Sequence, residues 1–464
     1  MSLSALVLAA GEGTRMKSRR PKVMHTICGK TMISWVLDTL LKLQDQGVID
    51  AIRVVVGSGA EEVKAEVAGR ASCIMQQERK GTGHAVMVAA PEIGEDEVLV
   101  LTGDCPLITP ETISNLYDVH RAEGAAATLL GTFLKDPTGY GRILRDQGGG
   151  ILRIVEETEA EPEELSICEV NTSTYIFNWK ALESALNGLS SDNSKGEYFL
   201  TDVLELLIAR EQRVAAYVTE DDLEVMGVNS RQHLALAEGV MRERINRKWM
   251  EEGVTMEDPA SVYIGAEVEI GMDTVLKPFV ILEGKTHIGE ECVIGPGARI
   301  RNSVIHNGVL IEQATVRECE LEDGVTVGPY ASLRPGSRLL AGSKVGTFVE
   351  TKMTILGKGS KVPHLSYIGD AEIGDGVNVG AGSITCNYDG AEKHGTVIEE
   401  GAFIGSDTMF IAPVRIGKGA VTGAGSAISK DVPDGALGLE RNEQKNILGW
   451  EKKTKRREDK EEKS

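Results

Sequence analysis

Five cationic side chains follow a glycine-rich turn near the start of the chain. The segment runs from Leu8 to Lys22 and reads LAAGEGTRMKSRRPK. Its cations are Arg15, Lys17, Arg19, Arg20 and Lys22. Glycines let backbone N–H groups approach oxygen atoms closely, and basic side chains neutralise negative charge. The segment has neither the G-K-[ST] of a Walker loop nor the third glycine of G-x-G-x-x-G. We interpret it as a phosphate cradle; the alternative is a glycine-rich turn beside a solvated basic surface.

A carboxylate follows an apolar run in the same half of the chain. Asp104 comes after VLVLTG. A carboxylate at a strand end beside a phosphate cradle suggests Mg²⁺, which takes one or two protein oxygens and leaves the rest to water and phosphate. The alternative for Asp104 is a helix N-cap ahead of PLITPE. A second glycine turn, QQERKGTGHA at 76–85, is equally compatible with a base-recognition loop and with an ordinary helix start.

The elements that must position these residues alternate between strand and helix patterns. Apolar runs predict buried strands at 5–10, 52–57, 72–76 and 98–104. Amphipathic stretches such as 32–44 and 83–90 predict helices between them. This alternation predicts an α/β domain, a parallel sheet with helices on both faces. Ligands of such sheets bind beyond the carboxyl ends of the strands, where the first glycine turn and Asp104 are expected.

A helix is predicted after this domain, because apolar residues recur every three or four positions from Ser230 to about Met250. Ser230 or Asn229 can cap its start, and Gly253 can end it.

After this helix, the hydrophobic pattern changes to a repeat of six residues. Aliphatic residues recur at 264, 270, 276, 282, 288, 294 and 300, and the pattern returns at 398, 404, 410 and 416. A beat of six predicts a three-sided parallel coil whose aliphatic side chains point inward. Residues 262–435 are therefore expected to form a prism of about ten coils, stacked at the ~4.8 Å spacing of strands. Longer stretches near 357–367 and 386–397 interrupt the beat and predict functional loops, which hold PHLSY and NYDG.

Charge and cysteine content narrow the class of protein. The formal net charge is -20 with a pI near 5.0, which argues against a general nucleic-acid or membrane-surface binder. The seven cysteines form no C-x-x-C pair, so free thiols in a reducing cytosol are expected. The apolar segment 2–10 is short and reads as a buried strand, and no run approaches the ~18 residues of a membrane span. The charged tail 451–464 is expected to be disordered.

Several motifs resemble those of a known family. LAAGEGTRM…PKV, GTGHA, DPTGYGRI, EVNT and GVNSR resemble sugar-nucleotide pyrophosphorylases. Together with PHLSYIGDAEIG…NVGAGSITCNYDG, they resemble the bifunctional N-acetylglucosamine-1-phosphate uridyltransferase and glucosamine-1-phosphate N-acetyltransferase family over nearly the whole chain. The resemblance implies a Rossmann-like nucleotidyltransferase domain at 1–228, a helical linker at 229–250, and a left-handed parallel β-helix acetyltransferase domain of hexapeptide repeats at 251–464.

The resemblance assigns roles in the first half. Residues expected to line UDP-N-acetylglucosamine are Leu8, Ala10, Gly11, Lys22, Gln76, Gly81, Thr82, Gly141, Glu156, Asn171 and Asn229. Asp104 and Asn229 are expected to bind Mg²⁺. The sugar 1-phosphate would attack the α-phosphorus of UTP and release pyrophosphate. Its phosphate is already ionised, so catalysis needs positioning and charge neutralisation by Mg²⁺, Arg15 and Lys22. Two departures from the family are TGD at 102–104, which lacks the usual aromatic, and Ser173, which stands near the expected sugar pocket where glycine is usual.

The resemblance also assigns roles in the second half. Acetyl transfer to an amine needs a base, and a histidine suits this at neutral pH. The resemblance marks His364 as that base; without it, a surface histidine is the plainer interpretation. Glucosamine 1-phosphate would contact Arg334, Lys352, Tyr367, Asn378 and Asn387. Acetyl-CoA would lie along Ala381, Asn387, Tyr388, Ser406, Ala424 and Arg441. Pro363 and the ERNEQ around Arg441 depart from the family pattern.

These expectations describe a cytoplasmic two-reaction enzyme. Its substrates would be UTP, glucosamine 1-phosphate, N-acetylglucosamine 1-phosphate and acetyl-CoA, with Mg²⁺ as cofactor and no nucleic-acid or membrane partner. The resemblance implies a homotrimer with acetyl sites between subunits. The rival interpretations are a single-activity nucleotidyltransferase whose solenoid only assembles the oligomer, and a purely structural or binding solenoid with an inactive first domain.

Overall fold

The computed structural model describes residues 2–11, 13–57, 61–192 and 196–450, so the predicted charged tail lies outside the described residues. Its contacts divide the chain into two compact units. The first unit comprises Met1–Glu252 with Pro259–Val268, and the second comprises Gly253–Asp258 with Glu269–Ser464. These units are defined by contacts between residues and not by function. The functional division at 228 and 250 therefore remains a prediction.

A nine-stranded sheet forms the centre of the first unit. Its main path has the order β11-β7-β10-β6-β1-β4-β5, and β8 and β9 extend it beside β10. The strands are β1 (Leu3–Ala9), β4 (Ala51–Gly57), β5 (Ser72–Gln76), β6 (Glu97–Thr102), β7 (Ala127–Phe133), β8 (Gly141–Arg145), β9 (Ile151–Val155), β10 (Glu169–Asn178) and β11 (Val214–Thr219). A separate pair consists of β2 (Thr26–Ile27) and β3 (Lys30–Thr31). The four strands predicted from apolar runs are β1, β4, β5 and β6, which lie side by side in parallel.

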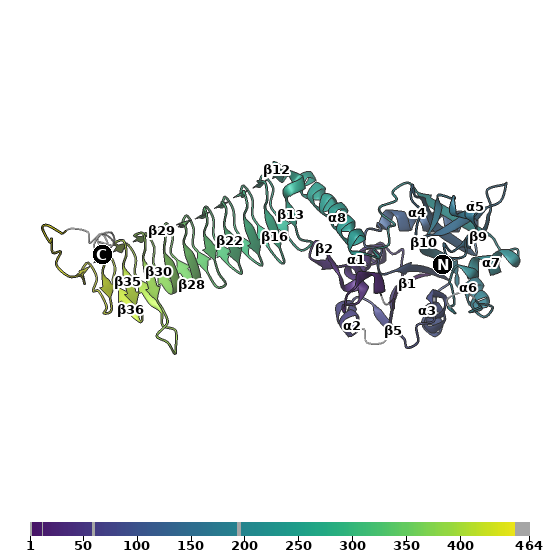
Figure 1. Cartoon of the computed structure of the whole chain (residues 1–464), viewed down its shortest axis with the longest axis horizontal. Helices are drawn as coiled ribbons and strands as arrows, with labels where there is room; N and C mark the ends of the chain where they lie inside the picture. The colour runs from purple at the N-terminus through teal and green to yellow at the C-terminus, as the bar shows by residue number, and fades with distance from the viewer. Residues whose placement is uncertain (1, 12, 58–60, 193–195, 451–464) are drawn as a thin grey trace, which may run out of the picture. The chain divides into compact units, whose positions relative to one another are not determined.

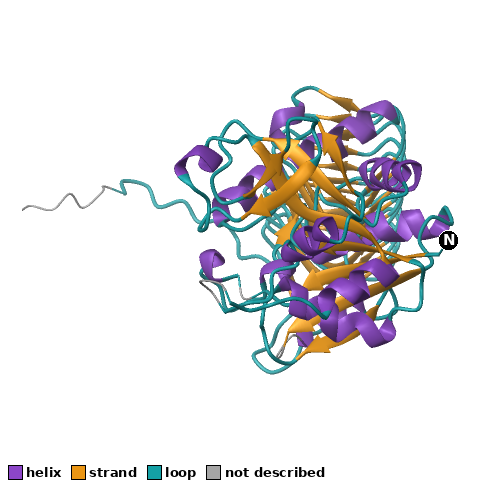
Figure 2. Ribbon diagram, turned by 90° about the vertical axis from the view of Figure 1, so that its right-hand side faces the viewer, coloured by secondary structure: helices purple, strands orange, loops and turns teal. Residues whose placement is uncertain are grey.

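Helices cover both faces of this sheet, as Figures 1 and 2 show. The α-helices are α1 (Met32–Asp45), α2 (Glu61–Val67), α3 (Thr82–Ala89), α4 (Pro110–Glu123), α5 (Pro162–Leu165), α6 (Trp179–Leu186), α7 (Asp202–Ala209) and α8 (Arg231–Glu251). The 3-10 helices are η1 (Thr14–Met16), η2 (Lys22–Met24), η3 (Ala90–Glu92) and η4 (Pro259–Ser261). Strand residues alternate between two cores, because successive side chains point to opposite faces. Helices α1, α2 and α4 pack in one core, and α3, α6 and α7 in the other.

The sheet is not wholly parallel, which corrects the prediction. Strand β10 runs antiparallel to the three strands it pairs with, β6, β7 and β8. The reversal has a consequence for the site. Tyr175 pairs with Val100 and Asn178 with Glu97, so the beginning of β10, rather than its end, lies at the carboxyl end of β6. Residues 171–173 therefore lie at the edge of the sheet where ligands of α/β folds bind.

The helix predicted after residue 229 is α8. The side chain of Ser230 accepts a hydrogen bond from His233 N and caps its start. Ala237, Met241 and Trp249, three of the residues that form the predicted apolar repeat, are buried. Among the helices of the described ranges, none combines the length and apolar character that crossing a bilayer requires.

The second unit is a solenoid of short parallel strands (Figure 1). One of its sheets has 11 strands. They are β12 (Thr255–Met256), β15 (Val275–Leu276), β18 (Val293–Ile294), β21 (Leu310–Ile311), β24 (Thr326–Val327), β27 (Lys344–Thr347), β29 (Lys361–His364), β31 (Asn378–Val379), β34 (Phe403–Ile404), β37 (Val421–Thr422) and β39 (Leu437–Gly438).

A sheet of 17 strands forms the other two faces of the solenoid. They are β13 (Tyr263–Ile264), β14 (Glu269–Ile270), β16 (Ile281–Glu283), β17 (His287–Ile288), β19 (Arg299–Arg301), β20 (Val304–Ile305), β22 (Thr315–Arg317), β23 (Glu320–Leu321), β25 (Ser332–Leu333), β26 (Arg338–Leu339), β28 (Glu350–Leu356), β30 (Tyr367–Ile373), β32 (Ile384–Cys386), β33 (Thr396–Ile398), β35 (Met409–Ile411), β36 (Val414–Ile416) and β38 (Ala427–Ile428). The two faces share one sheet because β28 bends around a corner, so that its first residues pair with β25 and its last with β26.

The aliphatic repeat fills the core of this solenoid. Every aliphatic residue of the beat from Ile264 to Ile300 is buried, and so are Ile398, Ile404, Phe410 and Ile416. Burying an aliphatic side chain of this size contributes roughly 1.5–3 kcal/mol to the free energy of unfolding. The repeat places one such side chain on each face of every coil. The residues four positions after each of the first six aliphatic residues are small or branched and are also buried, namely Val268, Thr274, Val280, Thr286, Cys292 and Ala298. This architecture is the parallel β-helix that the period predicts.

Strand registers correct one of the two predicted interruptions. Val275 pairs with Val293, which spans one full coil, whereas Thr347 pairs with His364 across a coil that is one position shorter. The stretch 357–367 is therefore no inserted loop: it contains β29 and the start of β30. The interruption at 386–397 is an insertion, because Ile384 pairs with Met409, well beyond the length of an ordinary coil. This insertion is a hairpin in which Tyr388 bridges Lys393.

Candidate functional site

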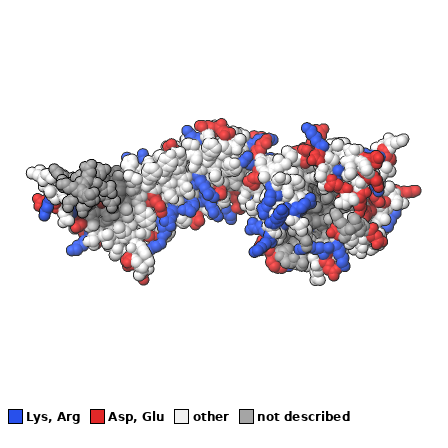
Figure 3. All heavy atoms as spheres, viewed as in Figure 1, with Lys and Arg blue, Asp and Glu red and all other residues white. Residues whose placement is uncertain are grey.

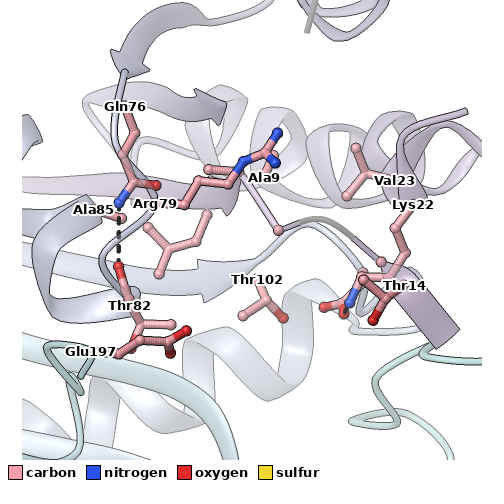
Figure 4. A pocket seen from close by; sticks show the side chains of 16 residues that line it. Ala9, Thr14, Lys22, Val23, Gln76, Arg79, Thr82, Ala85, Thr102 and Glu197 are labelled. Carbon is pink, nitrogen blue, oxygen red and sulfur yellow. Dashed lines mark hydrogen bonds and ion pairs between the residues drawn. The ribbon is translucent and has the colours of Figure 1, made fainter. Parts of the chain in front are cut away.

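A cavity of about 570 Å³ opens at the carboxyl ends of β1, β5 and β6. Its lining residues are Leu8, Ala9, Ala10, Gly11, Gly13, Thr14, Lys22, Val23, Gln76, Arg79, Gly81, Thr82, Ala85, Thr102, Asp104 and Glu197. The set includes the seven nucleotide-contact residues predicted between Leu8 and Thr82, and also Asp104. Figure 4 shows Gln76 and Thr82 on one side of the cavity and Thr14 and Lys22 on the other. A cavity therefore occupies the strand-end position where the ligand is expected, and nucleotide contact by its lining residues remains a prediction.

The first glycine turn brings Lys22 to this cavity. Gly13 has φ of 63°, and a Cβ there would lie 2.7 Å from the Lys22 Cβ. Only glycine combines this backbone conformation with so close an approach. The Lys22 ammonium donates to Asn229 Oδ1 at 2.9 Å and forms an ion pair with the Asp104 carboxylate. Two protein oxygens from distant segments therefore converge on one cation beside the cradle.

The neighbouring Cys105 is not a nucleophile at this site. Burial, with a smaller contribution from the Asp104 charge, raises the pKa of its thiol to about 12. The thiol stays protonated at neutral pH, and it is the thiolate that reacts. Asp104 itself does not cap the following helix, since the N-cap of α4 is Thr109. The N-cap alternative for Asp104 is thus wrong.

The second glycine turn is both a cavity wall and a helix start. Gly81 precedes α3 with φ of 100°, and a Cβ there would lie 2.5 Å from the carbonyl oxygen of Tyr198. Gln76 Nε2 donates to the Gly81 carbonyl at 3.3 Å, which fixes the amide at the cavity wall. The helix start is therefore confirmed, and base recognition by this turn remains a prediction.

A second cavity of about 210 Å³ adjoins the first. Its lining residues are Leu8, Thr82, Thr102, Glu156, Ser173, Tyr175, Glu197, Phe199, Leu200 and Thr201. Four of them, namely Leu8, Thr82, Thr102 and Glu197, also line the larger cavity. Glu156 is one of the residues predicted to line UDP-N-acetylglucosamine. Gly141 packs beside it, since a Cβ at Gly141 would lie 3.7 Å from Glu156 Oε1. Asn171 is buried behind the wall, and its Nδ2 donates to Tyr175 Oη at 2.7 Å.

Sequence reasoning missed several residues of these walls. Arg79 and Glu197 line the larger cavity, and Phe199 and Thr201 line the smaller one. The backbone of Tyr198 holds their loop in place by pairing with Lys80 O and Gly83 N. The one local signal for this loop is the acidic-aromatic run EYF at 197–199, which has no strand or helix period.

Arg15 lies beside the larger cavity without lining it. It belongs to η1, whose first residue, Thr14, lines the cavity, and its side chain is exposed. The other cations of the segment that do not line the cavity, Lys17, Arg19 and Arg20, are exposed as well. Figure 3 shows lysine and arginine side chains gathered over the N-terminal part of this unit. A chain of net charge -20 thus concentrates positive charge at the cradle.

Stability of the first unit should depend on pH through Asp202. Burial, together with the charges of Glu205, Glu159 and Glu156, raises the pKa of this carboxyl to about 6. An unfolded aspartate titrates near 3.9, so folding favours the protonated form. The stabilising contribution present below about pH 4 is therefore lost as the pH rises towards 6. We expect Asp202→Asn to raise the melting temperature of this unit at pH 7.5 and to leave it unchanged at pH 4, as measured by circular dichroism.

Asp136→Asn is the control, because the pKa of Asp136 is shifted in the opposite direction to that of Asp202. Thr138 lowers the pKa of the Asp136 carboxyl through hydrogen bonds from its hydroxyl and its backbone N–H, so the charged form is favoured there and its removal should not raise the melting temperature at pH 7.5. A gain for Asp202→Asn that is equal at pH 4 and pH 7.5 would show that the Asp202 charge is not the cause.

His364 lies at the end of β29, on a coil without an insertion, with its side chain exposed. A row of backbone hydrogen bonds runs from His364 along one corner of the solenoid. Gly382 N donates to His364 O, Asp407 N to Ala381 O, and Gly425 N to Ser406 O. Arg441 Nη1 then donates to Ala424 O at 3.0 Å. The residues predicted for acetyl-CoA at 381, 406, 424 and 441 therefore follow one another along this corner.

Four of the five residues predicted for glucosamine 1-phosphate lie on an adjoining face. Arg334 N donates to Thr351 O, Lys352 pairs with Gly369, and Tyr367 begins the strand that follows His364. A Cβ on Gly369 would lie 2.5 Å from Tyr367 Oη and 2.9 Å from Asn387 Nδ2, so these two groups converge over the glycine. Asn378 lies apart from them within one chain, because it pairs with Lys361 and Phe403 on the face that carries β29.

The hairpin inserted at 386–397 supplies a further cation. Lys393 lowers the pKa of Lys352, chiefly through a side-chain contact, and burial adds to the effect. Arg334, Lys352 and Lys393 therefore place positive charge on one face, where Glu350 pairs with Arg334 and the Asp370 charge acts on Lys352. The exposed Tyr388 is part of the same hairpin. Lys393 was not predicted, because nothing in the sequence marks a hairpin residue as reaching back to Lys352.

Comparisons with known proteins agree with both units. A family model described as nucleotidyl transferase matches residues 4–253, and one described as bacterial transferase hexapeptide (six repeats) matches 267–302 and 395–430. The bifunctional protein GlmU of Heliobacterium modesticaldum is 51% identical over 96% of this chain and 98% of its own length. GlmU of Desulfitobacterium hafniense is 48% identical over 98% of this chain and 99% of its own length. GlmU of a Geobacillus species is 50% identical over 95% and 96%.

Fold, site and matched models define a two-domain transferase, in which a nucleotidyltransferase is followed by a left-handed hexapeptide-repeat β-helix. At about half identity over nearly full length, the chain belongs to the bifunctional GlmU family. It is accordingly an acetyltransferase and a uridyltransferase that together make UDP-N-acetylglucosamine. The family predicted from the sequence motifs is confirmed, and the two rival interpretations, which allow at most one activity, are wrong.

Proposed function

We propose that uridylyl transfer takes place in the two adjoining cavities of the first unit. The observation that carries this proposal is the convergence of Lys22, Asp104 and Asn229 beside the glycine turn. UTP would occupy the larger cavity, with N-acetylglucosamine 1-phosphate in the smaller one. A phosphate oxygen of the sugar would form a bond to the α-phosphorus while the bond to the leaving pyrophosphate breaks. Lys22 and Arg15 would hold the charge that develops on the phosphates.

Mg²⁺ fits the residues of this site. Asp104 and Asn229 offer two hard oxygens at one point, the kind of ligand that Mg²⁺ takes from proteins. No cluster of three or more histidine, cysteine or acidic residues suited to a metal occurs in the described ranges. The remaining ligands would therefore be water and phosphate. Bound Mg²⁺ would supply positive charge to the triphosphate, and Lys22 would shift towards a phosphate oxygen.

Acetyl transfer would take place at the corner of the solenoid that holds His364. His364 would take a proton from the ammonium group of glucosamine 1-phosphate, and the free amine would attack the thioester carbonyl and release coenzyme A. Arg334 and Lys352, with Lys393 beside them, would hold the phosphate. Acetyl-CoA would lie along the row of residues from Ala381 to Arg441, in contact with Asn387 and Tyr388.

An omission assay tests the two reactions together. The complete mixture contains the protein, glucosamine 1-phosphate, acetyl-CoA, UTP and Mg²⁺, and each component is left out in turn. We expect N-acetylglucosamine 1-phosphate and free coenzyme A without UTP or Mg²⁺, and UDP-N-acetylglucosamine and pyrophosphate only with all five. Formation of UDP-N-acetylglucosamine without Mg²⁺ after chelation would contradict the metal assignment, and its formation without acetyl-CoA would contradict the order of the reactions.

We further propose a homotrimer in which neighbouring subunits complete the acetyl site. Support comes from an apolar edge of the solenoid, the corner residues Phe279, Tyr330, Phe348 and Leu365, each more than half exposed. The Tyr330 and Phe348 rings stack 5.4 Å apart. Exposed aromatic stripes of this kind are typical of interfaces. The separation of Asn378 from the other acceptor residues is also what a site shared between subunits requires.

We expect Phe348→Asp to convert the trimer into smaller species, since the charge would be buried at the interface. Light scattering should give three times the 49.9 kDa chain mass for the parent protein and a lower mass for the variant. Leu152→Asp, on an exposed apolar residue of the first unit, is the matched control and should stay trimeric. A parent protein that is a stable and active monomer would contradict the proposal.

A cytoplasmic location is the last part of the proposal. All seven cysteines are free thiols, and free thiols suit a reducing compartment. Cell fractionation with an antibody to the chain would test this location.

A further inference from the structure

Ser173 has an unusual backbone conformation for a serine within a strand. Its φ is 59°, and it lies in β10 at the point where the register with β7 shifts, between Asn171 and Tyr175. The left-handed region is unfavourable for a residue with a Cβ and is normally taken by glycine. Strain of this kind persists where the surrounding structure holds it, and it is common at binding sites. A serine in this conformation is therefore of functional interest where its side chain also reaches a binding cavity.

The side chain of Ser173 lies in the wall of the smaller cavity and is exposed there. This cavity shares Leu8, Thr82 and Thr102 with the larger one, which places it next to the triphosphate site. The reversed direction of β10 brings Ser173 to this edge of the sheet. The hydroxyl is thus presented where the acceptor of the uridylyl group would bind.

The neighbours of Ser173 hold it in this position. Its backbone N–H donates to Asn171 Oδ1 at 3.2 Å. Asn171 Nδ2 donates to Tyr175 Oη at 2.7 Å. The Asn171 carbonyl and one of its N–H groups are therefore used within the protein. Asn171 and Tyr175 are both buried, so Ser173 is the exposed member of this group in the cavity wall.

We propose that Ser173 is a specificity-determining residue of the uridylyl acceptor site, whose hydroxyl shares a hydrogen bond with one hydroxyl of the sugar 1-phosphate. This inference rests on the proposed function of the two cavities. Asn171 and Tyr175 act as positioning residues for the serine. The left-handed backbone conformation of Ser173 directs its hydroxyl towards the sugar. In an ordinary strand conformation, the hydroxyl would point across the sheet.

Two substitutions separate the hydroxyl from the backbone strain. Ser173→Ala keeps the Cβ and the strain and removes the hydroxyl. Ser173→Gly removes both. We expect both variants to lower kcat/KM for N-acetylglucosamine 1-phosphate by about fivefold, the effect of one hydrogen bond. Only Ser173→Gly should also raise the melting temperature. Asp273→Gly, which relieves a similar φ of 61° in the solenoid, is the control that should leave kcat/KM unchanged.

Deoxy analogues identify the partner hydroxyl. With the 3-, 4- and 6-deoxy forms of N-acetylglucosamine 1-phosphate, we expect the penalty of Ser173→Ala to vanish for one analogue and to persist for the other two. Unchanged kcat/KM in Ser173→Ala, or an equal penalty with all three analogues, would overturn the inference while the parent enzyme remains active. Failure of the proposed function would differ, since the parent enzyme would then transfer uridylyl groups to none of these sugars.

Discussion

Replacing His364 by alanine should abolish acetyl transfer and leave uridylyl transfer unchanged. A positioned general base contributes roughly 10²–10⁴-fold to a rate, so coenzyme A release should fall by at least about a hundredfold. The side chain is exposed at the end of β29 and belongs to no buried core, so folding should be preserved. Rates of coenzyme A release and pyrophosphate release, measured on the same preparation, report the two reactions separately.

His287→Ala is the matched control, because His287 is also an exposed histidine on a solenoid strand. It should retain both activities. Loss of both activities in His364→Ala would mean that the two sites are not independent, and full acetyl transfer would exclude His364 as the base.

Replacing Arg15 by alanine should lower kcat/KM for uridylyl transfer by about a hundredfold or more, comparable to the loss of one donor that stabilises transition-state charge. Arg15 is exposed, and its neighbour Thr14 lines the larger cavity, so the guanidinium can reach a bound triphosphate. Acetyl transfer should be unchanged. Pyrophosphate release at saturating N-acetylglucosamine 1-phosphate is the measurement.

Arg19→Ala tests whether this effect belongs to one position or to the whole basic segment. Arg19 is exposed and lies further along the same segment. We expect it to change kcat/KM only slightly, and by less as salt is added, because a distant surface charge acts through screened attraction. Equal losses in the two variants would assign the effect to general charge, and unchanged turnover in Arg15→Ala would contradict the cradle.

Much of the fold was predictable, because each unit repeats a simple pattern. Buried strands at β1, β4, β5 and β6 follow from apolar runs, and the solenoid follows from its regular aliphatic beat. The antiparallel direction of β10 could not be predicted, since a buried strand reads the same in either direction. The stretch 357–367 was misread for a different reason. The coil that ends at His364 lacks one position of the full repeat, and this loss breaks the beat as an insertion would.

The site was predictable where its residues follow one another in the sequence. Glycines, cations and Asp104 lie in short segments at strand ends, where backbone geometry alone brings them together. Glu197 and Thr201 lie in a loop that backbone contacts of Tyr198 hold in place, so only the folded chain shows their position. Ser173 stood out as a departure from the family pattern, but its role depends on the reversed β10, which the sequence does not reveal.

The strand registers show that the two units differ in the sequence separation of their paired strands. In the first unit, Leu3 pairs with Glu97 and Val214 with Ala127, so large loops must close before the sheet exists. In the solenoid, each strand pairs with the equivalent strand of the next coil, as Val275 does with Val293, and the hairpin lengthens only the three pairings that span it. The entropy lost when one more coil docks is therefore nearly constant, however many coils precede it. Such a stack can lengthen from any nucleus, and the slow step in folding the whole polypeptide should be the closure of the mixed sheet.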